Sequence, residues 1–546
     1  MSILHKLRRS IRSFSGDKRA NVMITFALAT LPIVGFTGFA VDYSHANSVK
    51  AAMQAAVDST ALMLSKEAST DTASQLQTNA SKYFNALFTR PEATSVSLTA
   101  TYTATGGSQI LVNGSANVPT QFLGVIGYKN IPVTASSTAK WGSSRLRVAL
   151  VLDNTGSMAD SGKITALITA TKSLLTQLQN AATTNGDVYV SIVPFVKDVN
   201  LGSSNYSSSW IDWSNWLAEP ASVSSNYPSG WDQVNGGDSC PFSNSSYGFG
   251  CKSGPAMNAS STNYIPSSGS YAGYICPDMD SGSKNARLNS VWYNGCYNSV
   301  AATRTISSGS SASCGSTTNC SCSGSGSSKT CKQTYYNHTW ITNATSTWNG
   351  CVMDRGDDTA PNSGNYDTNV VAPNTSITAT LYTAEQYDPC PQAAMGLSYN
   401  WSAMTTLVNN MTPNGGTNQN IGLQLGWMSL AGGGPFTVPA MDPNYTYTQI
   451  IILLTDGLNT EDRWYGNGSS TSTQVDARQT LTCNNIKAAN ITLYTIQVNT
   501  GGDPTSTLLQ NCASSSDKFF LLTSASAIVT TFNTIGTNLT KLRVAK

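Results

Sequence analysis

The chain has 546 residues, enough for two to four domains at roughly 100–200 residues each. Charged residues make up only 11 % of it, against about 25 % in an ordinary soluble domain, and the net charge is +2. Such a chain lacks the basic face that phosphate binding needs, so we exclude nucleic acid as the main partner. The only histidines are His5, His45 and His338, and none lies near a partner motif. This argues against Ser-His-Asp hydrolases and His-rich zinc sites.

The first 41 residues have the pattern of a membrane anchor. Residues 1–20 hold six basic residues and one acidic residue, and Ala20–Val41 contains no charge. As a helix, these 22 uncharged residues span about 33 Å, enough for the core of a bilayer. We predict a basic cytoplasmic segment at 1–20 and a transmembrane helix at 21–41, with the rest of the chain on the far side of the membrane. A cleaved signal peptide is the alternative, which the length of the apolar run disfavours.

Residues 42–142 predict a helical region followed by a small antiparallel sheet. Apolar residues recur at three- and four-residue steps from Asp42 to about Phe88, and with period two beyond Pro91. This order of elements resembles that of pilins and pseudopilins at the level of fold.

Residues 143–199 and 400–546 alternate strands with helices. The apolar run Val148–Leu152 is typical of a parallel strand that is covered on both faces. The later strand Gln449–Leu454 is followed by further helix and strand patterns. We therefore predict an α/β domain with a doubly wound, mostly parallel sheet.

Residues 200–399 interrupt this domain. Ten of the twelve cysteines lie between Cys240 and Cys390, in sequence rich in Ser, Gly and Asn. A structureless loop of this length is unusual in a compact domain, and cysteines in an exported chain favour disulfides, so we predict a disulfide-stapled subdomain.

Two shorter patterns in the 200–399 insertion have alternative interpretations. The close spacing of Cys314, Cys320, Cys322 and Cys331 would allow a metal cluster, but it matches no zinc pattern. The tripeptide Arg355-Gly356-Asp357 is a known type of receptor ligand, although three residues occur readily by chance.

The last two cysteines, Cys483 and Cys512, stand apart from the other ten. They lie on or near successive predicted helices that flank one strand. We predict a disulfide between them.

Hydroxyl and carboxylate side chains gather where the predicted strands end. Asp153, Thr155 and Ser157 follow the first strand of the α/β domain at alternate positions. Thr417 lies in a second loop just before a helix, and Asp456 follows a later strand. Ligands of open parallel sheets bind beyond the carboxyl ends of the strands. Hard oxygen ligands of this kind suit Mg²⁺, although Mn²⁺ or Ca²⁺ would accept them too.

This set of residues resembles the metal-ion-dependent adhesion site of von Willebrand factor A domains, whose pattern is Asp-x-Ser-x-Ser, a Thr and a later Asp. Thr155 stands at the first Ser position and keeps the hydroxyl. The resemblance implies that Thr155 and Ser157 coordinate the cation directly, while Asp153 and Asp456 hold metal-bound waters. It also implies that Thr417 coordinates directly or through water, and that an open position accepts an acidic group of a partner.

The same residues allow two other interpretations. Asp153-x-Thr-Gly-Ser157 also resembles the start of haloacid-dehalogenase-like phosphoryl-transfer enzymes, with Asp153 as nucleophile and Asp456 binding Mg²⁺. The loop around Thr417 has no role in such an enzyme. The other interpretation is a sheet domain whose loop hydroxyls merely cap helices.

The amino-terminal part resembles TadG-like proteins of tight-adherence (Flp) pilus assembly in bacteria. The resemblance lies in Ala20-Asn21-Val22 at the start of the apolar run, in Gly38–Tyr43, in Gln54–Asp58 and in Phe122–Gly127. Gly16 is followed by Asp17 and no Glu, so a prepilin-type cleavage motif is not evident.

Together the two resemblances imply a single-pass protein of the bacterial inner membrane with a cytoplasmic amino terminus and an exported carboxy-terminal part. We expect it to act in pilus assembly, to bind pilus assembly or pilin-like proteins, and to have neither an enzymatic activity nor a small-molecule substrate. A surface adhesin for host or matrix ligands is the alternative, and a Mg²⁺-dependent phosphatase is a weaker one.

Overall fold

A computed structural model describes residues 21–544 except 69–70, 104–107, 142–143, 244, 281–290, 358–363 and 444. The basic segment predicted at 1–20 lies outside the described residues. The chain divides into two compact units, one formed mainly by the residues up to Ser144 and the other mainly by Arg145–Met441 and Tyr447–Lys541.

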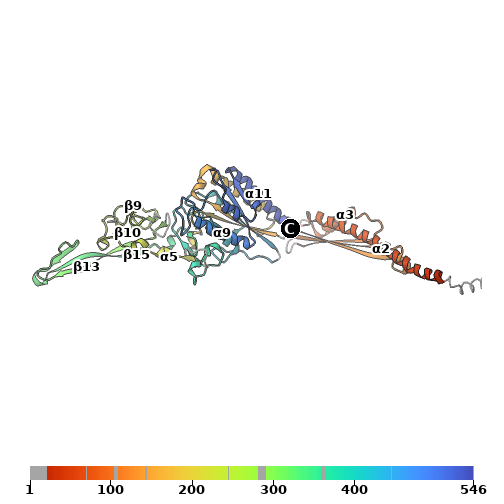
Figure 1. Ribbon diagram of the computed structural model, residues 1–546, viewed down its shortest axis with the longest axis horizontal. Helices are drawn as coiled ribbons and strands as arrows, with labels where there is room; N and C mark the ends of the chain where they lie inside the picture. The colour runs from red at the N-terminus through yellow and green to blue at the C-terminus, as the bar shows by residue number, and fades with distance from the viewer. Residues whose placement is uncertain are drawn as a thin grey trace, which may run out of the picture. The chain divides into compact units, whose positions relative to one another are not determined.

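The first unit consists of two helices on a three-stranded sheet (Figure 1). Its elements are α2 (Asn21–Leu64), α3 (Ala73–Leu87), β1 (Thr94–Thr103), β2 (Ser108–Pro119), the 3₁₀ turn η1 (Leu123–Ile126) and β3 (Asn130–Trp141). The strands pair antiparallel in the order β1-β2-β3. Val49, Met53 and Val57 of α2 are fully buried in the core that the helices share with the sheet. The predicted pilin-like order of helix and antiparallel sheet is confirmed.

Helix α2 extends well beyond this core. Among the described residues, one helix is long and apolar enough to cross a membrane, and it is the Thr25–Leu64 part of α2. Only 11 % of its most apolar window is buried inside the protein. This agrees with the apolar segment predicted at 21–41.

The second unit is built on a six-stranded sheet. Its strands, from one edge to the other, are β18 (Met395–Ser398), β5 (Val188–Phe195), β4 (Ser144–Asp153), β19 (Thr446–Thr455), β20 (Thr492–Val498) and β21 (Phe519–Leu522). Counted along the chain, this is the order 3-2-1-4-5-6 of a doubly wound sheet. The edge strand β18 runs antiparallel to β5, whereas β5 is parallel to β4. The domain thus has the von Willebrand factor A-type fold, as predicted.

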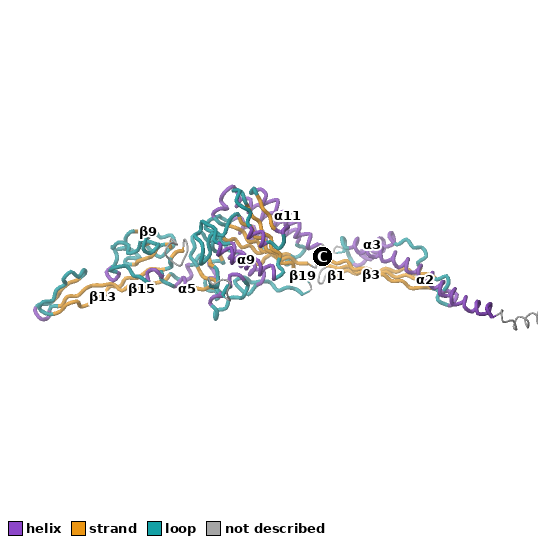
Figure 2. The backbone as a smooth tube through the Cα atoms, viewed as in Figure 1, coloured by secondary structure: helices purple, strands orange, loops and turns teal. Residues whose placement is uncertain are grey.

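Helices cover both faces of this sheet (Figure 2). One face carries α4 (Lys163–Ala181), α7 (Trp401–Asn409) and α11 (Ser526–Val544), and the other carries α8 (Gln419–Ala431), α9 (Thr473–Ala488) and α10 (Thr507–Cys512). Strand β4 is buried on both sides because its alternate residues enter the two separate cores. Helix α8 packs tightly against β4, since a Cβ added at Gly426 would lie 2.5 Å from Val151 Cγ2.

The predicted insertion contributes to the α/β domain itself. Strand β18 lies inside the 200–399 segment and completes the main sheet. A small second sheet has the order β6 (Val199–Asn200), β16 (Cys351–Met353), β17 (Tyr382–Ala384) and β7 (Ile211–Asp212). Its apolar side chains share a core with α8 and α9.

The rest of the insertion forms a β-rich subdomain around a long hairpin. Its main sheet has the order β14 (Cys320–Ser323), β15 (Thr330–Thr342), β13 (Gly295–Ser308), β10 (Tyr274–Pro277), β8 (Cys251–Lys252) and β9 (Ser261–Thr262). Short elements flank it, namely α5 (Ser214–Leu217), α6 (Ala221–Ser224) and the pair β11 (Met279–Asp280) and β12 (Val291–Trp292). The core is largely aromatic, with Phe249 and Tyr297 fully buried.

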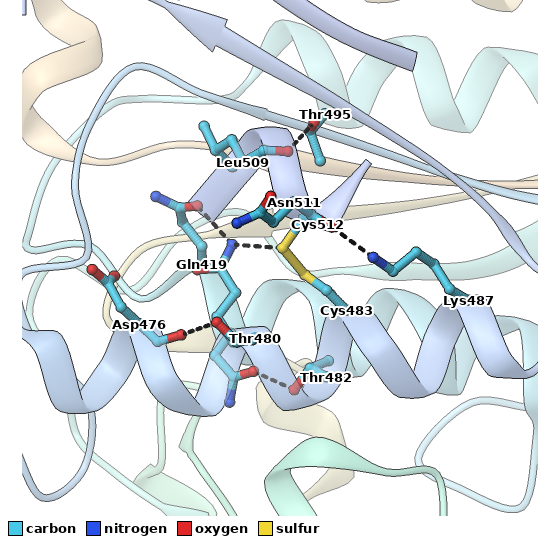
Figure 3. The surroundings of a disulfide bond; sticks show 12 residues. Gln419, Asp476, Thr480, Thr482, Cys483, Lys487, Thr495, Leu509, Asn511 and Cys512 are labelled. Atoms are coloured by element: carbon cyan, nitrogen blue, oxygen red, sulfur yellow. Dashed lines mark hydrogen bonds between the residues drawn. A yellow bond between two sulfur atoms is a disulfide. The ribbon is translucent and has the colours of Figure 1, made fainter. Parts of the chain in front are cut away.

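All twelve cysteines form disulfides. The pairs are Cys240–Cys251, Cys276–Cys296, Cys314–Cys320, Cys322–Cys331, Cys351–Cys390 and Cys483–Cys512. The four closely spaced cysteines Cys314, Cys320, Cys322 and Cys331 are thus bonded in pairs and offer no thiolate ligands to a metal cluster. The structure also forms the bond expected between Cys483 and Cys512, which joins α9 to α10 (Figure 3).

Removal of the Cys483–Cys512 bond should destabilise the α/β domain. Two hydrogen bonds also hold α10, from Lys487 Nζ to Asn511 O at 2.6 Å and from Thr495 Oγ1 to Leu509 O at 2.7 Å. The double change Cys483→Ala, Cys512→Ala should therefore leave the fold intact and lower its unfolding free energy by about 2–4 kcal/mol. Urea unfolding measures this change. The pair Cys322→Ala, Cys331→Ala in the hairpin is the control, and an equal loss there would contradict a local role of the bond.

Candidate metal site

Three loops meet at the point where the strand order of the main sheet reverses. Strands β4 and β19 are neighbours in the sheet, and Asp153 ends the first while Asp456 directly follows the second. The third loop precedes α8 and is tied to the first, because Gly156 N donates a hydrogen bond to Gly415 O at 3.0 Å. The fold therefore brings together the three segments that the sequence singled out.

Asp153 is the organising residue of the first loop. Its side chain is fully buried, and Oδ1 accepts hydrogen bonds from Thr155 N at 2.8 Å and Thr155 Oγ1 at 2.6 Å. Its other oxygen, Oδ2, accepts from Thr455 Oγ1 at 2.7 Å. Both oxygens are thus engaged, one within the loop and one with the last residue of β19.

The hydrogen bonds continue from Thr155 to the loop after β19. Thr155 Oγ1 lies 3.2 Å from Ser157 Oγ, and Ser157 Oγ donates to Asp456 Oδ1 at 2.7 Å. Four of the five predicted site residues therefore form one continuous run of oxygen atoms.

Lys163 is a site residue that the sequence analysis missed. It is the first residue of α4, and its ammonium donates a hydrogen bond to Asp456 Oδ2. The side chains of both partners are nearly inaccessible to solvent. In the sequence it is only a lysine at a predicted helix start, six residues after Ser157. An ordinary surface lysine would look the same.

Thr417 is held by its backbone. Its N–H donates to Thr460 Oγ1 at 2.8 Å, and its carbonyl accepts from Thr460 N at 2.9 Å. Within the described part of the chain, no hydrogen bond joins its hydroxyl to the other four predicted residues. Its loop is beside the site, but its side chain is not part of the bonded run.

The donor atoms of the site suit a cation, and Lys163 compensates the charge of its carboxylates only in part. Burial, and then the neighbouring charge of Asp456, raise the pKa of Asp153 to about 7. The donors are carboxylate and hydroxyl oxygens, with no nitrogen or sulfur ligand among them, which is the chemistry that Mg²⁺ prefers. The ammonium of Lys163 already places one positive charge on Asp456. These residues fit a divalent cation.

Asp354, a buried acid of the insertion, supports the third loop, and it belongs to a group with two further buried acids, Asp367 and Asp462. Asp354 Oδ2 accepts from Asn418 Nδ2 at 2.7 Å, and Asn418 is also the N-cap of α8. Burial, and then the charges of Asp462 and Asp367, raise the pKa of Asp354 to about 8. The sequence did not indicate this group, because its members come from distant segments.

The tripeptide Arg355-Gly356-Asp357 has a structural role for its arginine. The Arg355 guanidinium is buried and donates to the carbonyl oxygens of Tyr366 at 2.9 Å and Asn369 at 2.8 Å. A buried guanidinium cannot meet a receptor, which argues against the receptor-ligand interpretation.

The amino-terminal segment matches a known protein family. Residues 20–63 match the family model described as "Putative Flp pilus-assembly TadE/G-like". The resemblance seen in the sequence is thereby confirmed for this segment. No curated protein matches the chain.

Several solved structures align with low similarity. The pilus adhesin SpaC from Lactobacillus rhamnosus GG is 12 % identical with a TM-score of 0.28, over 83 % of this chain. This chain spans about a third of that protein, 35 % of its length. The von Willebrand factor domain of the type V pili tip protein Mfa5 from Porphyromonas gingivalis is 8 % identical, with a TM-score of 0.30 over 72 % of this chain and 95 % of that one. The PilB minor pilin from Streptococcus sanguinis is 10 % identical, with a TM-score of 0.31 over 83 % and 80 %.

Proposed function

We propose that this chain, whose residues 20–63 are TadE/G-like, is a membrane-anchored exported protein of Flp pilus assembly that binds a partner through a divalent cation. The observation that carries the proposal is the run of hydrogen bonds from Asp153 to Asp456 at the carboxyl edge of the sheet. An apolar helix lies at the amino-terminal end of the same chain. The partner would be a pilus assembly or pilin-like protein.

Each site residue has a proposed role toward the cation. The hydroxyls of Thr155 and Ser157 would hold it directly, Asp153 and Asp456 would hold its water ligands, and Thr417 would join directly or through water. When bound, the cation supplies an open coordination position for a carboxylate of the partner. Mg²⁺ fits best, with Mn²⁺ or Ca²⁺ as alternatives.

The phosphatase alternative finds little support in the geometry. A nucleophilic carboxylate must itself touch the substrate, whereas a carboxylate that holds a metal-bound water need not. Asp153 is fully buried, and both of its oxygens accept hydrogen bonds from the protein. A binding role without catalysis is the better proposal. A surface adhesin that uses the same site on host or matrix ligands is the second candidate.

The proposed location is the bacterial inner membrane, with a single pass, a cytoplasmic amino terminus and a periplasmic or cell-surface carboxy-terminal part. The distribution of basic residues supports this orientation, since all six in the first 20 residues precede the apolar helix.

Titration of Mg²⁺ and Mn²⁺ into the full-length protein in detergent micelles tests the site. We expect saturable binding of one cation by calorimetry, and none in the double variant Asp153→Ala, Asp456→Ala. Asp517→Ala, which removes an exposed carboxylate near the carboxy-terminal strand, is the matched control and should bind normally. Equal binding by all three proteins would show that the cation lies elsewhere.

Replacement of Lys163 should make the stability of the folded protein depend more strongly on a bound cation. Lys163→Met leaves the buried Asp456 carboxylate without its counter-charge, which costs about 3 kcal/mol of unfolding free energy in the absence of metal. A bound divalent cation replaces that charge, so Mg²⁺ should raise the melting temperature of this variant more than that of the wild type. Lys172→Met, an exposed change on the same helix, is the control. An equal Mg²⁺ shift in all three proteins would contradict the shared use of Asp456.

A deletion strain tests the role in assembly. We expect loss of pili by electron microscopy, restored by the wild-type gene and not by the Asp153→Ala, Asp456→Ala variant. Normal pili with poor adherence would instead favour the adhesin. Immunoblotting must show equal amounts of both proteins in the membrane fraction.

A further inference from the structure

The part of helix α2 that packs against the rest of the first unit begins at a defined residue. The described side chains between Val22 and Thr37 are exposed, apart from a half-buried Thr30. From Gly38 onward the helix buries one face, beginning with Gly38 and Asp42. The protein-covered part of α2 therefore starts at Gly38, inside the apolar stretch that extends to Val41.

A loop from the sheet is fastened to α2 at this level. It is the 121–128 loop between β2 and β3, and three of its backbone N–H groups donate to the Asp42 carboxylate. The distances are 2.9 Å from Gln121, 3.0 Å from Phe122 and 2.7 Å from Leu123.

Gly38 lets the loop approach the helix. A Cβ added at Gly38 would lie 2.6 Å from Phe122 Cβ, closer than real contacts allow. The glycine and the carboxylate, one helical turn apart, thus fix the height of the 121–128 loop on α2.

The tip of the 121–128 loop is apolar and open. Val125 is 87 % exposed, and Ile126 and Tyr128 are each 69 % exposed. The exposed rings of Phe39 and Tyr43 stack on each other on the same part of α2. Single exposed apolar residues are common, but a fixed loop that presents several of them marks an interaction surface.

The length of the exposed helix places this surface at a membrane boundary. Residues 21–37 span about 25 Å as a helix, which is less than the ~30 Å core of a bilayer. The hydrocarbon must therefore reach the level of Gly38–Val41 for the apolar stretch to cross it. Tyrosines are enriched at such boundaries, and the exposed Lys129 follows the loop where lipid phosphates would lie.

We propose that the 121–128 loop is a second membrane contact, which inserts Val125 and Ile126 among the lipids beside the end of the transmembrane helix. The occupant of this apolar surface is the phospholipid bilayer, because the surface is continuous with the lipid-facing part of α2. The proposal rests on the membrane anchor of the proposed function. Two contacts at one depth would set the height and tilt of the first unit on the membrane.

Photo-crosslinking to lipid tests the contact. The full-length protein is made with p-benzoylphenylalanine in place of Val125, Val34 or Val300 and reconstituted into phosphatidylethanolamine–phosphatidylglycerol nanodiscs. Val34 on α2 and Val300 on β13 are both 53 % exposed, so they are matched positive and negative controls. After irradiation, mass spectrometry should find lipid adducts at positions 125 and 34 and none at 300.

The outcomes separate the two proposals. Lipid adducts at 34 without any at 125 would overturn the loop contact and leave the anchor intact. No adducts at either position would remove the anchor itself. Protein–protein adducts at 125 would show that a partner or a second copy covers the surface, and would also overturn the proposal.

A second variant tests the fastening of the loop. Asp42→Ala removes three charge-assisted hydrogen bonds and should lower the yield of lipid adducts at 125 about tenfold while leaving the yield at 34 unchanged. Asp58→Ala, an exposed change on the same helix, should alter neither yield. Unchanged labelling at 125 in the Asp42→Ala protein would overturn the role of the carboxylate.

Discussion

The loop at the candidate metal site depends on the hydrogen bonds that the buried Asp153 carboxylate accepts. One oxygen binds the N–H and hydroxyl of Thr155, and the other binds the hydroxyl of Thr455 at the end of the neighbouring strand. A buried carboxylate is costly unless such donors surround it. Because its oxygens are used inside the protein, Asp153 organises the loop, and the hydroxyl of Ser157 and the carboxylate of Asp456 form the far end of the bonded run.

The sequence predicted where Asp153, Ser157 and Asp456 would gather because strand ends are local signals. A continuous apolar run ending in Asp153 identifies a buried parallel strand, and neighbouring parallel strands bring their carboxyl ends to one edge. Lys163 escaped prediction for the opposite reason. A lysine at a helix start is ordinarily solvated, and only the folded sheet brings it to Asp456, 293 residues away in sequence.

The structure of the insertion could be predicted from the sequence only in part. The sequence did not show that part of the insertion belongs to the α/β domain. The strands that join it to the domain are too short for any periodicity, since β18 has four residues and strands such as β6 and β7 have two. Disulfides were expected from the even cysteine count, but the count leaves the pairing open. In the structure each of the ten cysteines pairs with a neighbour along the chain, as where the register of β14 and β15 sets Cys322 opposite Cys331. The aromatic core around Tyr297 likewise joins residues from separate segments.

Although the chain has few charged residues, some of them form ion pairs in its interior. Lys197 pairs with Glu385 and Arg478 with Asp367, all almost completely buried, and both acids belong to the insertion. Buried ion pairs contribute little net stability, but removal of one partner is costly, so they restrict the geometry of their surroundings. Asp354 of the same segment binds Asn418, the cap of α8 that follows Thr417. The insertion therefore contributes to the domain by holding the loop that carries Thr417, beside the candidate metal site. Any partner bound there would meet a surface whose shape the insertion helps to set.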